Sequence, residues 1–171
     1  RATMLLNLTH RLTLNHYLIA FILLAFLALA LLSARQAIWE LYLSADVYNA
    51  VEAGNASKVE ALLKKGANPN RIGAGGLVGG TPLTWATEKS DLKIMKALIR
   101  GGADVNKRIG RDFTALMLAP TPQAAQLLLD AGANPRLQNE DGQTALQFAQ
   151  EMKLSQVVKV LLRAETKHKN P

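Results

Sequence analysis

The chain has 171 residues, with 20 Lys and Arg against 13 Asp and Glu, a formal charge of +7, and no Cys. This length suits one ordinary domain with an appendage, and a content of 49% hydrophobic and 19% charged residues excludes a disordered chain. The absence of Cys excludes a disulfide framework, a thiolate metal or iron–sulfur site, and a Cys nucleophile.

An apolar run without a single charge occupies residues 17–34, YLIAFILLAFLALALLSA. As a helix, 18 residues span roughly 27 Å, close to the hydrocarbon core of a bilayer at about 30 Å. Arg35 and Trp39 follow the run, as cations and aromatic rings do at a membrane interface. The sequence therefore predicts a single transmembrane helix at 17–34, acting as an uncleaved signal anchor, between an N-terminal flank, 1–16, and a juxtamembrane connector, 35–43.

Two alternatives compete with an anchor. The run could be a buried core helix, although such helices are seldom apolar on every side for this length. It could also be a cleaved signal peptide, for which residues 32–34 (LSA) offer a weak cleavage site, although the run exceeds a usual signal core. The chain starts with Arg1, and Met4 is a plausible initiator.

The orientation of such an anchor follows from the cations at its two ends. Arg1 and Arg11 lie before the run, whereas Arg35 is the one Lys or Arg after it until Lys58. This bias favours a cytoplasmic N-terminus. With the compact size and the short N-terminal flank, we expect a bacterial inner-membrane protein with the C-terminal part in the periplasm.

The remainder of the chain repeats two short motifs, and a pair of large aliphatic residues, at 62–63, 98–99 and 128–129, precedes each copy of the second motif. The first motif is TPLTWA, TALMLA and TALQFA, at 81–86, 114–119 and 144–149, with starts 33 and 30 residues apart. The second is GANPN, GADVN and GANPR, at 66–70, 102–106 and 132–136. A period of about 33 residues is typical of stacked helical repeats.

The pattern resembles the ankyrin repeat, in which TPLHxA opens a first helix and a second helix ends in LL before GADxN. The resemblance covers about residues 44–166, ahead of a polar tail at 167–171. It implies an all-α solenoid of about four helix-turn-helix repeats with projecting loops. The residues support this physically: each first motif starts with a Thr suited to an N-cap, and each second motif starts with a Gly suited to a left-handed helix end.

The chain departs from the ankyrin pattern at three places. The usual His of TPLH is replaced by Thr84, Met117 and Gln147. Repeat three is three residues short around 120–122 (PTP), which predicts a tight turn between its helices. The loop at 71–80, RIGAGGLVGG, is long and glycine-rich. It lacks the preceding strand of a dinucleotide-binding loop, so we interpret it as a solenoid loop whose Leu77 and Val78 can conform to a partner.

Catalysis and metal binding are not expected. The histidines, His10, His16 and His168, all lie outside the repeats, so neither a catalytic His set nor a His-rich metal site can be assembled from them. The carboxylates are scattered among loops and helix ends. We therefore expect a protein that is not an enzyme and has no cofactor, metal or small-molecule substrate.

The surface residues expected to bind a partner come from the loops and the concave face of the solenoid. Residues 44–171 carry 17 Lys and Arg against 12 Asp and Glu. The basic cluster Lys107, Arg108 and Arg111 indicates either a solvated surface or contact with an acidic protein or anionic lipid; no nucleic-acid readout motif is present. Phe113 could anchor a partner or pack under its own loop. In the ankyrin frame Trp85, Leu118 and Phe148 are core, and the predicted partner-binding residues are Glu88, Lys89, Lys107, Arg108, Arg111, Phe113, Gln143, Glu151 and Met152.

The predicted function is a membrane-anchored protein–protein interaction module. We expect an accessory subunit or scaffold of a membrane-associated complex, with a lipid bilayer around 17–34 and a protein partner on the repeats. An immunity or inhibitor protein that binds a toxic enzyme, an anionic-lipid-binding adaptor and an enzyme module remain alternatives.

Overall fold

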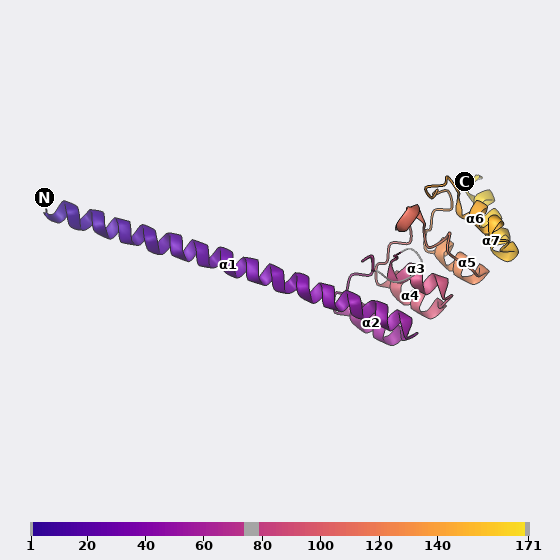
Figure 1. Ribbon diagram of the computed structural model, residues 1–171, viewed down its shortest axis with the longest axis horizontal. Coiled ribbons are helices and arrows are strands. Elements are labelled where there is room, and N and C mark those ends of the chain that lie inside the picture. Colours follow the sequence, from indigo (N-terminus) through magenta and orange to yellow (C-terminus); the bar gives the residue numbers. More distant parts are fainter. Residues whose placement is uncertain (1, 74–78, 170–171) are drawn as a thin grey trace. The chain divides into compact units, whose positions relative to one another are not determined.

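The computed structural model describes residues 2–73 and 79–169. The chain forms two compact units, Arg1–Leu41 and Tyr42–Pro171, and each is described by itself. Helix α1, Ala2–Glu52, supplies all of the described part of the first unit and the first helix of the second (Figure 1). The tip of the glycine-rich loop, with Leu77 and Val78, lies outside the described residues.

The first unit contains one segment that is long and apolar enough to cross a membrane, Phe21–Trp39, with a mean hydropathy of 2.1. None of this segment is buried, and its large apolar side chains are exposed, as Phe26 is at 67%. Length and composition fit a membrane span and equally fit a signal sequence. The predicted span began at Tyr17, and the side chains of residues 17–20 lie outside the described part.

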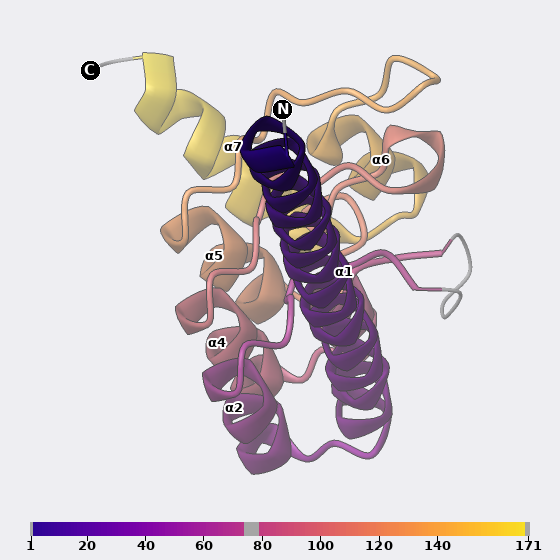
Figure 2. The same cartoon turned by 90° about the vertical axis from the view of Figure 1, so that its left-hand side faces the viewer.

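The second unit is a two-layer stack of helices (Figures 1 and 2). Neighbouring helices of the outer layer pack against one another in the order α2, α4, α5 and α7, while α3 packs on α4 and α6 on α7. The inner layer contains residues 42–52 of α1, α3 (Pro82–Glu88) and α6 (Ala145–Glu151). The outer layer contains α2 (Ala56–Lys64), α4 (Leu92–Arg100), α5 (Pro122–Asp130) and α7 (Ser155–Lys169). The described residues form no strand, as an ankyrin-type solenoid predicts.

The core of the stack is formed by the aliphatic residues that repeat along the chain. The first member of each aliphatic pair is buried, with Leu62 at 6% exposure and Leu98, Leu128 and Leu161 at 0%. The second member is half-buried, except for Leu162 at 45%. Each buried Leu contributes about 1.5–3 kcal/mol relative to an exposed one, so these pairs hold successive repeats together. Leu43, from the predicted connector, is also part of this core.

The helix ends follow the predicted capping chemistry with one exception. Thr81 and Thr144 accept hydrogen bonds from the backbone N–H groups of Thr84 and Gln147, and Pro82 occupies the first turn of α3. The repeated glycines after the outer helices have positive φ angles, +93°, +87° and +91° at Gly66, Gly102 and Gly132. These left-handed positions explain why the second motif begins with Gly.

Thr114, the exception, caps no helix, because the first helix of repeat three is reduced to one turn. Residues 115–118 form a hydrogen-bonded turn, whereas the resemblance to ankyrin repeats implies a helix at this place. The three missing residues and Pro120 account for this difference, because the residue before a proline is pushed out of the helical region. The next helix, α5, begins with Thr121 as its N-cap and Pro122 behind it. The inner layer is therefore interrupted between α3 and α6.

Candidate partner-binding surfaces

A ladder of asparagine side chains joins the loops of successive repeats. Asn70 accepts a hydrogen bond from the Asp104 N–H at 2.6 Å and donates one to the Gly102 carbonyl at 3.1 Å. Asn106 does the same one repeat later, with the Asn134 N–H at 2.7 Å and the Gly132 carbonyl at 3.1 Å. An amide side chain can satisfy both groups because it carries a donor and an acceptor side by side.

The loop between repeats two and three, residues 102–113, is a tight hairpin. Ile109 and Phe113 pair across its base, and a 3₁₀ turn at Gly110–Asp112 forms its tip. Arg111 and Asp112 both have positive φ angles, +57° and +60°, which cost about 1–2 kcal/mol for each residue that has a Cβ. Arg108 forms an ion pair with Asp112 at 2.6 Å within this loop.

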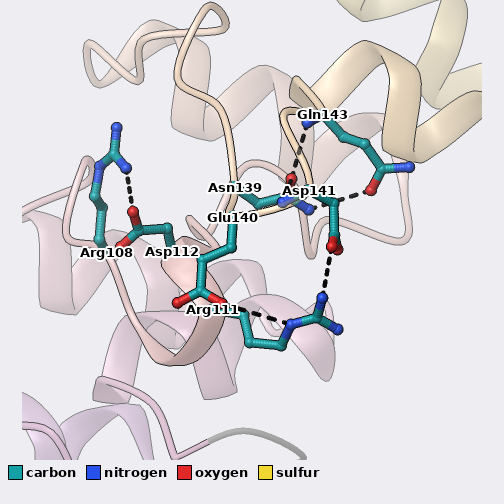
Figure 3. A network of polar contacts seen from close by, with 7 residues as sticks. All are labelled: Arg108, Arg111, Asp112, Asn139, Glu140, Asp141 and Gln143. Carbon is teal, nitrogen blue, oxygen red and sulfur yellow. Dashed lines mark hydrogen bonds and ion pairs between the residues drawn. The ribbon is translucent and has the colours of Figure 1, made fainter.

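Arg111 connects this hairpin to the loop of the next repeat (Figure 3). Its guanidinium lies 2.6 Å from the Asp141 carboxylate and 3.8 Å from that of Glu140, and its carbonyl accepts a hydrogen bond from the Glu140 N–H at 3.1 Å. Inside the second loop, the buried Asn139 accepts from the N–H groups of Asp141 and Gln143. These contacts fix the positions of two neighbouring loops.

The pairing of these arginines changes the interpretation of the basic cluster. The structure brings Arg108 and Arg111 beside Asp112, Glu140 and Asp141, so the loop edge is close to neutral. All of these side chains are about half exposed, and exposed pairs of this kind stabilise a protein by about 0–1 kcal/mol each. Lys107 is half-buried and makes no ion pair within the described part of the chain.

Phe113 packs against an aromatic side chain of the next repeat. Its ring meets the ring of Phe148 edge to face, with 5.2 Å between the ring centres, and both rings pack against the core. The predicted core positions Trp85, Leu118 and Phe148 are half-buried, unlike the fully buried leucines. Trp85 on α3 and Phe148 on α6 pack against the core from the inner layer, whereas Leu118 lies in the turn at 115–118.

Four of the predicted residues occupy matching positions at the C-terminal ends of the inner helices. Glu88 and Lys89 end α3, and Glu151 and Met152 end α6. Lys89 lies 5.6 Å from the centre of the Trp85 ring and donates a hydrogen bond to the Glu52 carbonyl at 3.2 Å. Glu151 accepts a hydrogen bond from the Gln143 side chain. Met152 is 56% exposed, a high value for an apolar side chain.

The carboxylate of Glu88 differs from that of Glu151 in being partly buried. Partial burial raises the pKa of this carboxyl above its ordinary value, and the carboxylate forms no ion pair among the described residues. A carboxylate at a helix C-terminus also meets the negative end of the helix dipole. The charged form of Glu88 is therefore poorly compensated in the isolated chain.

Sequence reasoning missed the role of Tyr48. Its hydroxyl accepts a hydrogen bond from the Gly73 N–H at 2.7 Å and lies within hydrogen-bond distance of the Arg71 and Gly80 carbonyls. Burial raises the pKa of this phenol, opposed by the Gly73 hydrogen bond and the Arg71 charge. Gly73 is required here because a Cβ would lie 2.6 Å from the tyrosine ring. A tyrosine 25 residues from a glycine-rich loop gives no sequence signal of this contact.

Comparisons with known proteins agree with the repeat architecture. A family model described as ankyrin repeats, in three copies, matches residues 47–135. The probable E3 ubiquitin-protein ligase XBOS34 of Oryza sativa subsp. japonica is 37% identical over 67% of the chain, and the mitochondrial disaggregase of Bos taurus is 33% identical over 67%. SH3 and multiple ankyrin repeat domains protein 1 of Homo sapiens is 34% identical over 56%.

These relatives are much longer proteins. The matched segments span 23%, 17% and 4% of their lengths, in the same order, so the similarity concerns the repeats alone. Ankyrin repeats suggest a protein–protein interaction module, and they are generally not catalytic. The matching family model, the two-layer helical stack and the left-handed glycines after the outer helices lead to one conclusion: the chain belongs to the ankyrin-repeat family.

Proposed function

We propose that this chain is a membrane-anchored protein-interaction module, and that it serves as an accessory subunit or scaffold of a membrane-associated complex. The observation that carries this proposal is the combination of an ankyrin solenoid with the wholly exposed apolar segment Phe21–Trp39. A soluble monomer rarely exposes a continuous apolar surface of this extent. In a bilayer the same surface is solvated by hydrocarbon.

The dimensions of the segment support the anchor. Nineteen helical residues are roughly 28 Å long, which matches a hydrocarbon core of about 30 Å. Trp39 and Tyr42 at its end have the amphipathic rings that favour the membrane–water interface. Holding the solenoid at the membrane raises its effective concentration toward partners in the same membrane. We also propose, from the Lys and Arg bias, that the N-terminus is cytoplasmic and the solenoid periplasmic.

The partner is proposed to contact the C-terminal ends of the inner helices. Glu88 forms no ion pair among the described residues, and Met152 is an exposed apolar side chain. A partner that places a cation beside Glu88 would compensate its negative charge, and a partner that places an apolar surface on Met152 would remove that side chain from water. Lys89 and Glu151 flank these groups. The remaining predicted residues, Lys107, Arg108, Arg111, Phe113 and Gln143, shape the loops beside this surface.

Extraction of cell membranes at alkaline pH tests the anchor. The wild-type chain should remain in the membrane pellet, and a Leu27→Arg/Leu31→Arg variant should move to the soluble fraction because two charges in the hydrocarbon region oppose insertion. A Leu27→Ile/Leu31→Ile variant is the matched control and should stay in the pellet. Protease treatment of spheroplasts then tests the orientation, and a solenoid protected from digestion would contradict the periplasmic assignment.

Photocrosslinking tests the partner surface. A photoreactive amino acid at Met152 should give a discrete crosslinked species, because the proposal places that side chain against another protein. The same amino acid at Gln123, an exposed position on the outer helix α5, serves as the control and should give none. Crosslinks from Gln123 but not from Met152 would contradict the proposal and would show that the partner contacts the outer helices instead.

A further inference from the structure

The positive charge of the solenoid is concentrated on two helices that pack against each other. Helices α2 and α4, with the C-cap Lys65, carry six Lys and Arg and a single Glu, a net charge of +5. The rest of residues 44–171 has 11 Lys and Arg and 11 Asp and Glu, and is neutral. We call this surface the basic face; its cations are Lys58, Lys64, Lys65, Lys93, Lys96 and Arg100.

The cations of the basic face are available to an external partner. All six side chains are exposed, and among the described residues only Arg100 forms an ion pair, with Glu60 at 2.8 Å. This contrasts with the loop edge, where Arg108 and Arg111 are both paired. The basic cluster identified from sequence is thus compensated within the protein, and the uncompensated charge lies on the outer layer.

An open hollow lies on this face along the seam where α2 packs on α4. It has a volume of about 280 Å³ and is lined by Glu60, Leu63, Lys64, Ala97, Arg100 and Gly101. Lys64 supplies an ammonium group beside the apolar Leu63 and Ala97, and Arg100 supplies a guanidinium group that is shared with the carboxylate of Glu60. This combination suits a phosphate group that is attached to an apolar molecule, because the two cations meet the phosphate and the side chains meet the remainder.

We propose that the basic face binds the anionic phospholipid headgroups of the membrane in which the chain is anchored, an inference that rests on the proposed function. Five of its six cations are Lys, and lysine is depleted from protein interfaces, which favour Arg and aromatic residues. Clusters of several cations near a membrane segment attract anionic phospholipid headgroups electrostatically, so the inference requires an anionic leaflet on the side of the membrane that carries the solenoid. Helix α2 also begins only 17 residues after Trp39, so the basic face belongs to the repeats that follow the anchor directly.

The test uses the full chain in lipid nanodiscs and exploits the absence of cysteine. A fluorophore is attached to Ser57→Cys on α2 or, as a control, to Gln123→Cys on α5, two exposed positions. The discs contain a headgroup-labelled quencher lipid in phosphatidylcholine, with or without about a third of phosphatidylglycerol. We expect quenching at residue 57 to increase in the anionic discs and quenching at residue 123 to change little. About 1 M salt should remove the increase, because the Debye length then falls to about 3 Å.

A pair of charge variants makes the test specific. Lys58→Gln/Lys93→Gln/Lys96→Gln removes three cations of the basic face, and each is expected to account for about a fivefold change in the association constant, so the increase in quenching should disappear. Arg71→Gln/Lys107→Gln/Arg136→Gln lowers the net charge equally but leaves the basic face intact, and it should retain the increase. Circular dichroism of both variants checks that the helices are retained.

The possible failures are distinguishable. A chain that does not incorporate into discs of either composition would overturn the proposed anchor and this inference together. A chain that incorporates but shows equal quenching in neutral and anionic discs would overturn only the lipid-binding inference. Equal loss in the two triple variants would show that net charge, and not this face, determines the contact. Loss of a co-purifying protein in the basic-face variant, without a lipid effect, would assign the face to an acidic protein instead.

Discussion

Removal of the asparagine ladder should weaken the contact between successive repeats. In Asn106→Ala, the Asn134 N–H and the Gly132 carbonyl lose the side chain that they share. In Asn70→Ala, the Asp104 N–H and the Gly102 carbonyl lose theirs. Arg136 occupies the same place in the last motif, GANPR, and within residues 79–169 its side chain makes no hydrogen bond to a following repeat, so Arg136→Ala is the matched control.

The expected magnitude follows from the number of hydrogen bonds. Each contributes about 0.5–1.5 kcal/mol net, and these loops are partly exposed, so water replaces some of the loss. We therefore expect each Asn→Ala variant to lower the free energy of unfolding by about 1–2 kcal/mol. Arg136→Ala should lie within about 0.5 kcal/mol of the wild type, as most surface substitutions do.

Urea unfolding followed by Trp85 fluorescence measures these differences. The background variant Trp39→Phe removes the second tryptophan, so that the signal comes from the solenoid. With a slope of about 2 kcal/mol per molar urea, the midpoint should fall by roughly 0.5–1 M for each Asn variant. An Asn106→Ala midpoint equal to the wild type, or an equal fall for Arg136→Ala, would refute the idea that the ladder couples the repeats.

Three further predictions concern backbone strain and charge. Arg111→Gly should be more stable than Arg111→Ala by about 1 kcal/mol in the same urea assay. Both variants lose the ion pairs of Arg111, but only glycine adopts the positive φ angle without strain. Equal stability of the two variants would show that the backbone at residue 111 is not strained. Gly102→Ala should cost about 1 kcal/mol through its φ of +87° alone, because its Cβ would meet no atom within 4 Å. The raised pKa of Glu88 means that the folded state holds this proton more tightly than the unfolded chain does. Stability should therefore fall as the pH rises from about 4.5, the ordinary value, through the raised one, and Glu88→Gln should reduce this fall in a pH series of urea midpoints.

Local chemistry made much of the solenoid predictable from sequence. A Thr that can cap a helix, a Pro in the first turn and a Gly with a left-handed conformation act within a few residues, so Thr81, Pro82 and Gly102 could be placed without coordinates. The aliphatic pairs were equally informative because helix periodicity determines which side chain faces inward.

Repeat three shows where local motifs were insufficient. Its TALMLA motif matches its neighbours, yet residues 115–118 form only a turn. The motif alone predicts a helix, whereas the shortened connection and Pro120 leave too few residues to complete one. The spacing of the motifs shows that repeat three is three residues short, but the spacing alone does not show that its first helix is reduced to a turn.

The candidate surfaces depended most on long-range contacts. Arg111 pairs with Asp141, 30 residues away, and Phe113 stacks on Phe148. The motif spacing aligns Arg111 with Asp141, each three residues before a motif Thr, but it does not show that their side chains meet. The cations at 107–111 were therefore open to interpretation as a solvated surface. Helical spacing is enough to place Lys93, Lys96 and Arg100 on one face. Their union with Lys58 of the preceding repeat depends on the packing of α2 on α4.

The central claim, a membrane-tethered module that binds another protein, is tested most directly by isolating the full chain from membranes in mild detergent. Quantitative mass spectrometry should find one protein at a near-stoichiometric ratio to the wild-type chain. That protein should be reduced severalfold in Glu88→Arg/Met152→Glu and retained in the outer-surface control Gln123→Glu/Gln126→Glu. A clean monomer at every detergent concentration, or a partner retained equally by both variants, would contradict the account.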